Sequence, residues 1–90
     1  MATRRSVRCR LAHALLELRD QHGVVDDEGV LTVTLPISRQ DLADLLGTRP
    51  ETIARTTRAM QKDGVAAFHG RRIVIHDLDL LFDELDEGPS

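Results

Sequence analysis

The sequence predicts an α+β fold in which a small helical core is followed by a β-hairpin, and three observations support this. Two helix-forming segments, each with its own start signal, follow one another across Gly47. Two short segments rich in apolar and β-branched residues then flank a Gly-Arg turn. The chain has 90 residues, the size of one small domain. We therefore expect a single domain over residues 1–90.

Composition limits the class of protein. The chain has two Phe and no Trp or Tyr, so its core must be aliphatic. Its one cysteine, Cys9, excludes a disulfide within the chain and suits a reducing cytosol. No apolar run approaches the ~20 residues of a membrane span, and no signal-peptide pattern follows the basic first residues. We expect a cytoplasmic protein with no membrane partner.

The first third of the chain predicts a helix and a strand. The helix covers residues 5–22 and is followed by Gly23, a plausible stop. An acidic, turn-like stretch at 25–29 leads to a strand at 30–35, where apolar and polar residues alternate. Pro36 ends the strand. The apolar residues of the helix recur at spacings of four, four and three: Val7, Leu11, Leu15 and Leu18.

Residues 38–63 predict a helix-turn-helix. In the first helix Ser38 is the N-cap, with Asp41 at the capping-box position. Gly47 permits the left-handed turn that separates the two helices. The small Ala43 allows their close approach, and Ile53 packs the second helix against the first. The expected buried stripe of the first helix consists of Leu42, Leu45 and Leu46.

The second helix, about 49–63, has Thr48 as its expected cap, with Pro50 and Glu51 in its first turn. Strands from Val65 to His69 and from Arg72 to His76 form a hairpin, the wing, at 65–76. Residues 77–86 predict an acidic C-terminal helix. The sequence thus predicts a winged helix-turn-helix.

Charge is distributed unevenly. The net charge is −3, but six acidic residues and no basic ones follow His76. Between Gly47 and His76, six basic residues stand against two acidic ones, a local net charge of +4. A phosphate backbone interacts with a local basic surface rather than with the total charge. This segment therefore favours a nucleic-acid partner.

The second helix is predicted to enter the DNA major groove, which is wide enough for one helix. Glu51 and Arg55 are four residues apart and project together. Arg can bind guanine O6 and N7, and Glu can accept from cytosine N4, so this pair can specify a G·C base pair. The alternative is that Glu51 only caps the helix and Arg55 only forms an ion pair with it. Around this pair, Arg49 and Arg58 are expected phosphate contacts, as are Ser38 at the first helix and Arg71 at the wing tip.

Three segments together resemble the C-terminal DNA-binding domain of the Crp/Fnr transcription regulators. They are Ile37–Ala43, Leu46–Arg55 with its Glu-Thr-Ile-Ala-Arg core, and His69–Arg71 with the apolar residues after it. The resemblance covers about Arg10 to Leu80. It implies base contacts for Glu51 and Arg55 and sequence-specific binding of double-stranded DNA. It also implies phosphate contacts for Thr52, Arg39 and Gln40, and a wing tip formed by His69, Gly70 and Arg71.

The sequence departs from this family in three ways. Pro50 stands where some members use a DNA-contacting side chain, so specificity at that base pair does not carry over. Thr56 and Thr57 stand in a stretch that is commonly aliphatic, which either weakens packing or is met by hydrogen bonds to preceding carbonyls. The sensor domain and the long dimerisation helix of full-length members do not fit in 90 residues, so we expect no cofactor.

Other functions remain as alternatives. The four histidines match no metal-ligand spacing, and no catalytic motif stands out, so we expect neither a metal site nor an enzyme. A winged helix that binds proteins instead of DNA is the stronger rival. A homodimer is a further hypothesis, based on the apolar Val7–Leu18 face, and RNA polymerase is a further expected partner of such a regulator.

Overall fold

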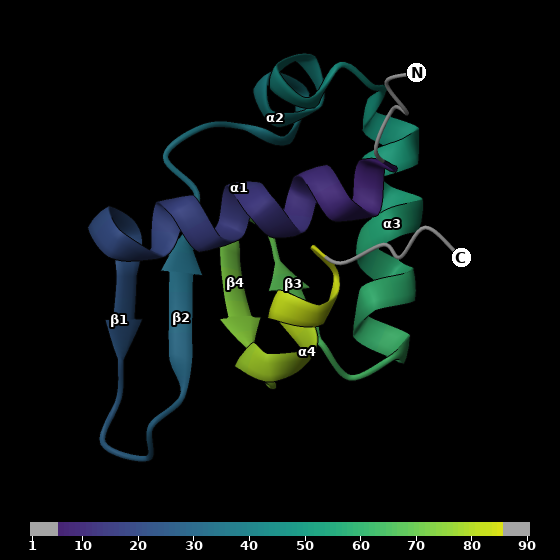
Figure 1. Ribbon diagram of the computed structural model, residues 1–90. Helices are drawn as coiled ribbons and strands as arrows, with labels where there is room; N and C mark the ends of the chain where they lie inside the picture. The colour runs from purple at the N-terminus through teal and green to yellow at the C-terminus, as the bar shows by residue number, and fades with distance from the viewer. Residues whose placement is uncertain (1–5, 86–90) are drawn as a thin grey trace.

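The computed structural model describes residues 6–85 and shows four helices and four strands in this part of the chain. The α+β prediction is confirmed. Figure 1 shows α1 running across the sheet, with α2 above it, α3 beside its N-terminal end and α4 below it. The elements are α1 (Val7–His22), β1 (Gly23–Val25), β2 (Leu31–Thr34), α2 (Arg39–Leu46), α3 (Pro50–Lys62), β3 (Ala66–His69), β4 (Arg72–Ile75) and α4 (Leu78–Asp83).

The strands form one antiparallel sheet in the order β1-β2-β4-β3. The wing is the β3–β4 hairpin, in which His69 is paired with Arg72 as the sequence predicted. β2 joins the wing to the rest of the sheet through the pairing of Val33 with Ile73. The wing is therefore part of a larger sheet and not a separate hairpin.

The sequence analysis missed strand β1. It predicted that the chain turns at Val25, but Gly23–Val25 pairs with β2 directly after α1 ends. Val24 and Val25 are 69% and 63% exposed, so this strand has no buried face to produce an alternating pattern. The acidic turn follows at Asp26, whose carboxylate accepts hydrogen bonds from the backbone of Glu28 and Val30, both at 2.9 Å.

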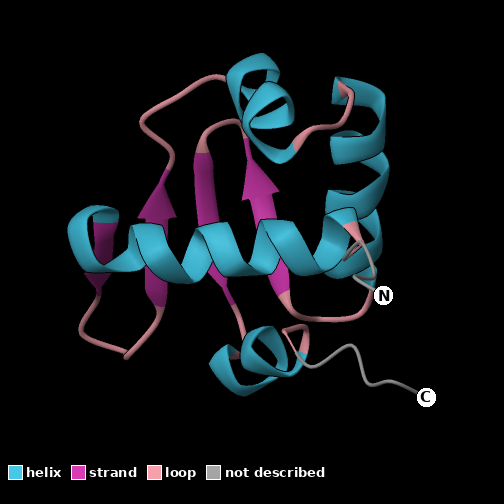
Figure 2. Cartoon of the chain, turned by 45° about the horizontal axis from the view of Figure 1, so that its top comes forward, coloured by secondary structure: helices cyan, strands magenta, loops and turns pink. Residues whose placement is uncertain are grey.

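Helix α1 supplies much of the core. It lies across one face of the sheet (Figure 2), and Leu11 and Leu15 are fully buried in the cluster that includes Val33 and Ile73. Val7 and Leu18 pack at its margin. The centre of the apolar face of α1 is therefore buried within the chain, so its apolar pattern does not by itself indicate a dimer.

The turn between α2 and α3 follows the predicted chemistry except at one position. Ser38 Oγ accepts a hydrogen bond from the backbone of Asp41 at 3.1 Å, and Gly47 has the left-handed φ of 69°. Thr48 does not cap α3, because the N-cap is Arg49 and makes no side-chain cap bond. The backbone N–H of Thr48 instead donates to the carbonyl of Ala43 at 2.9 Å, which closes α2.

The predicted buried stripe of α2 was wrong at Leu45, which is 69% exposed. Leu42, Ala43 and Leu46 form the buried face of this helix. Ala43 is fully buried and takes the place that the leucine pattern assigned to Leu45. The rule that leucines face the core therefore failed in a helix of only eight residues.

The structure shows how Thr57 is accommodated in a stretch that is commonly aliphatic. Its side chain is buried, and its hydroxyl donates to the carbonyl of Ala54 at 3.0 Å. The hydroxyl is thus satisfied within the helix, so a threonine is accommodated where an aliphatic residue was expected.

Two arginines of α1 connect it to the ends of the other helices. Arg8 contacts Glu84 at 2.6 Å and Asp63, the C-cap of α3, at 2.9 Å. The hydrogen bonds that Arg8 donates to the Glu84 carboxylate raise the pKa of Arg8 above its ordinary value, although burial opposes the shift. Arg10 donates to the carbonyl of Leu46 at the end of α2. The orientation of α1 relative to α2 and α3 is therefore fixed by polar contacts as well as by packing.

We predict that Leu42→Ala lowers the free energy of unfolding by about 2–5 kcal/mol, because it leaves a cavity in the core. Leu45→Ala is the matched control in the same helix and should change it by less than about 0.5 kcal/mol, since its side chain is exposed. Chemical denaturation of both variants measures the difference. Equal losses would contradict the inward face assigned to α2.

Gly23→Ala should destabilise the fold by about 1–3 kcal/mol, because a Cβ at this position would lie 2.4 Å from the carbonyl oxygen of Arg19. The clash is with backbone, so the junction between α1 and β1 would have to open. Gln21→Ala, an exposed change in the last turn of α1, is the control and should be nearly neutral. Thermal unfolding compares the two, and a neutral Gly23→Ala would show that this junction is looser than described.

Candidate nucleic-acid interface

Helix α3 has a buried side and an exposed, charged side. Ile53, Thr57 and Met60 are buried and hold the helix against the core. The positions opposite them are exposed and lie three or four residues apart, so they form one stripe along the helix. The stripe consists of Glu51, Arg55, Arg58 and Lys62.

Glu51 and Arg55 lie in the first half of α3 and are both exposed. Their spacing allows an ion pair, but among the ion pairs of residues 6–85 none joins these two side chains. Neither side chain is held by another residue in the part of the chain that the structure describes. Both side chains are exposed to groups outside the protein.

The start of α2 presents a second group of polar side chains. Ser38 and Gln40 are exposed, and Arg39 is half-buried. Gln40 donates to Asp44 at 3.2 Å on its own helix. Arg39 extends away from α2, and its Nη2 donates to the carbonyl of Gly70 in the wing turn at 3.3 Å. The start of α2 is therefore connected to the wing.

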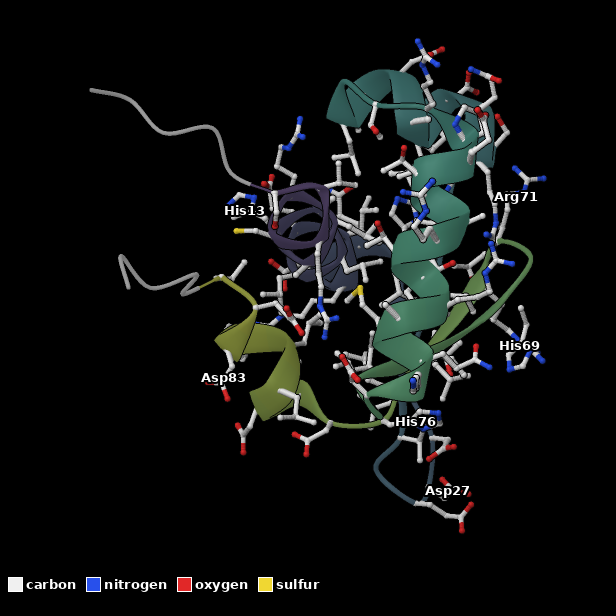
Figure 3. The ribbon with its side chains drawn as sticks, turned by 90° about the vertical axis from the view of Figure 1, so that its right-hand side faces the viewer. His13, Asp27, His69, Arg71, His76 and Asp83 are labelled. Atoms are coloured by element: carbon white, nitrogen blue, oxygen red, sulfur yellow. The ribbon has the colours of Figure 1, made fainter. Side chains whose placement is uncertain are left out.

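The wing turn places two sequence-predicted residues at the surface. His69 and Arg71 are exposed on either side of Gly70, which has a φ of 63°. Figure 3 shows Arg71 and His69 toward one edge of the view, with His13 and Asp83 toward the opposite edge and α3 between them. The wing tip thus projects away from the N-terminal and C-terminal helices.

Several of the acidic residues outside α2 and α3 lie apart from this surface. In Figure 3, Asp83 of α4 and Asp27 of the β1–β2 turn are well separated from Arg71. Glu84 and Asp63 both form ion pairs with Arg8. The net negative charge of the whole chain therefore does not describe the surface formed by α3, the start of α2 and the wing.

Apart from this surface, the described residues form a groove, but they contain no cluster suited to a metal ion and no membrane-spanning helix. Among residues 6–85 no group of three or more His, Cys, Asp or Glu side chains is placed to hold a metal ion. His13 contacts Glu17 one turn along α1 at 2.7 Å, and His69 and His76 lie at opposite ends of the wing hairpin. An open, mostly apolar groove of about 1010 Å³ lies between α1 and α2, with exposed Leu45 on its rim. No helix in the described residues is long and apolar enough to cross a membrane.

Sequence reasoning missed the side chains that hold the wing in place. Gln61, on α3, accepts a hydrogen bond from the backbone N–H of Phe68 in β3 at 3.3 Å. Arg39 was predicted only as a phosphate contact, yet it also binds the Gly70 carbonyl. These contacts join residues that are 7 and 31 positions apart and leave no periodic signal in the sequence.

Comparison with known proteins agrees with this arrangement. The family profile described as the Crp-like helix-turn-helix domain matches residues 9–83. The chain is 36% identical over 72 residues to the transcriptional activator protein FnrL of Cereibacter sphaeroides, which covers 79% of this chain and 27% of that protein. It is 34% identical over 79 residues to the nitrogen fixation regulation protein FixK of Azorhizobium caulinodans, covering 87% of this chain and 32% of that protein.

Solved structures give the same result. The structure of FixK2 from Bradyrhizobium japonicum superposes with a TM-score of 0.77 at 31% sequence identity. The match covers 97% of this chain and 41% of the FixK2 chain. The chain thus spans less than half the length of these regulators, and the likeness concerns one domain of each. Since the family profile covers nearly all of its length and the fold agrees, the chain belongs to the Crp-like helix-turn-helix domain family.

Proposed function

We propose that this chain is a sequence-specific, double-stranded DNA-binding domain of a transcription regulator, with α3 as its recognition helix. One observation carries the proposal: α3 buries one side and presents a charged stripe on the other, whose first residues, Glu51 and Arg55, form no ion pair within residues 6–85. A helix of this kind can enter a major groove with its N-terminal turns facing base edges.

Glu51 and Arg55 are the residues that we assign to base recognition. They share one face of α3, are exposed, and carry complementary hydrogen-bonding groups. Arg55 donates to guanine and Glu51 accepts from cytosine, so the pair selects a G·C base pair. Pro50 occupies the first turn beside them and offers no polar side-chain group.

The other exposed polar residues are assigned to the DNA backbone. The start of α2 provides backbone N–H groups and side chains for one phosphate, and α3 and the wing provide more. Their role is to fix the position of the helix on the duplex, not to select sequence. They are Ser38, Arg39, Gln40, Arg49, Thr52, Arg58, His69 and Arg71.

We place the protein in the cytoplasm, where a bacterial-type regulator meets its DNA, and assign it no catalytic activity. Support for this comes from the relatives, which are transcription regulators.

Homodimerisation stays a prediction, because two-fold symmetry would let one chain read each half of a palindromic site. Contact with RNA polymerase also stays a prediction. The winged helix as a protein-binding module remains the alternative, and no observation favours it over DNA binding.

Selection from a random-sequence duplex pool, at two salt concentrations, tests the proposal. The bound fraction should be enriched in a motif that contains a fixed G·C pair, and affinity should fall steeply as salt increases. Binding without enrichment would reduce the protein to a non-specific electrostatic binder. Absence of binding at low salt, by a chain shown to be folded, would favour the protein-binding alternative.

Arg55→Ala should weaken binding to the selected site by about 1–3 kcal/mol and relax the preference at the G·C pair, because a bidentate base contact is lost. Lys62→Ala is the control, since it removes a positive charge from the same stripe at the opposite end of α3. Lys62→Ala should weaken binding to all duplex sequences equally. Fluorescence anisotropy with the selected duplex and a duplex altered at that pair measures both effects, and identical behaviour of the two variants would exclude base recognition by Arg55.

A further inference from the structure

The wing turn needs support to hold a defined position. Residues 70 and 71 extend beyond the last pair of the hairpin, His69 with Arg72, and both are exposed. A Cβ placed on Gly70 would have no neighbouring atom within 4 Å beyond its own chain neighbours. Because turns of this kind bury little apolar surface, their position depends on the hydrogen bonds that reach them.

Besides the pairing of β4 with β2, three hydrogen bonds among the described residues connect the wing to the rest of the domain. The backbone N–H of Leu35 donates to the carbonyl of Arg71 at 2.8 Å, and the side chain of Gln61 accepts from Phe68 at 3.3 Å. The third is the bond from Arg39 to the carbonyl of Gly70. Among these, only Arg39 links the wing turn to the helix-turn-helix through a side chain.

Arg39 retains donors after making this contact. A guanidinium group has five N–H donors in a rigid plane, and the bond to Gly70 uses one of them. The remaining edge can face a phosphate, which suits a planar donor group. One residue can therefore hold the wing turn and the DNA backbone at the same time.

We propose that Arg39 is a wing-positioning residue, which holds the Gly70 carbonyl and thereby places the Arg71 side chain against the DNA backbone. The inference rests on the proposed DNA-binding function and adds to it a coupling between the start of α2 and the wing. Loss of Arg39 then removes its own phosphate contact and weakens that of Arg71, because only the bond from Leu35 to the Arg71 carbonyl still holds the turn. Loss of Arg71 removes one contact.

A double-mutant cycle tests this coupling. Each phosphate contact contributes about 0.9 to the slope of log affinity against log salt concentration. Arg71→Ala should therefore reduce the slope by about 1, and Arg39→Ala by more than that, up to about 2. The double variant should lose less than the sum of the two single variants, because Arg71 already binds the DNA less well once Arg39 is absent. Additive effects in the double variant would overturn the proposal.

Gln40→Ala is the matched control. Gln40 lies next to Arg39 at the start of α2 and is assigned to the same DNA backbone, but its side chain bonds to Asp44 and not to the wing. Its effect should add to that of Arg71→Ala. Equal non-additivity for Gln40 and Arg39 would mean that the coupling passes through α2 in general and would overturn the specific role of Arg39.

A measurement without DNA separates this inference from the proposed function. Backbone amide relaxation by nuclear magnetic resonance should show increased fast motion at Gly70 and Arg71 in Arg39→Ala and no change in Gln40→Ala. If the unaltered chain bound no duplex but the two variants showed this difference in motion, the positioning role would hold and the DNA-binding proposal would fail. An unchanged wing turn in Arg39→Ala would overturn the positioning role regardless of DNA binding.

Discussion

The left-handed turn at Gly47 is the constraint on which the rest of the structure depends. Its φ of 69° reverses the chain within three residues, between the end of α2 at Leu46 and the start of α3 at Pro50. The bond from Thr48 to the carbonyl of Ala43 fixes that geometry. A residue with a side chain adopts this conformation only at an energetic cost, which explains why glycine occupies the joint.

The direction of α3 is then maintained from both ends. Arg10 binds the carbonyl of Leu46 just before the turn, and Arg8 binds Asp63 just after α3. Both arginines belong to α1, whose apolar side is buried against the sheet. The exposed stripe of α3 is thus oriented by a rigid body, as base recognition requires, since contacts to base edges tolerate little displacement.

Local signals predicted much of this structure. The N-cap at Ser38, the turn at Gly47 and the hairpin around Gly70 were visible because they depend on residue types at fixed offsets. The errors arose where tertiary contacts decide the outcome. Leu45 is exposed because Ala43 completes the buried face of α2, and β1 carries no pattern because its valines face solvent.

In the candidate site, too, some features follow from local sequence signals and others from tertiary contacts. The charged stripe of α3 follows from helical spacing and could be predicted, whereas the bond from Arg39 to Gly70 joins two distant segments and could not. The first kind of feature is encoded in the order of residues along one element. The second appears only when the sheet brings the wing turn beside the start of α2.

The short strand β1 also bears on how the chain behaves at high concentration. It is one of the two edge strands of the sheet, with two exposed valines and an outward row of backbone groups that another strand could pair with. Three acidic residues follow it immediately, Asp26, Asp27 and Glu28, and the strand has only three residues. Like charges at this edge repel a second copy, and the short length offers few bonds to it. This edge is therefore protected against the edge-to-edge association that leads to aggregation.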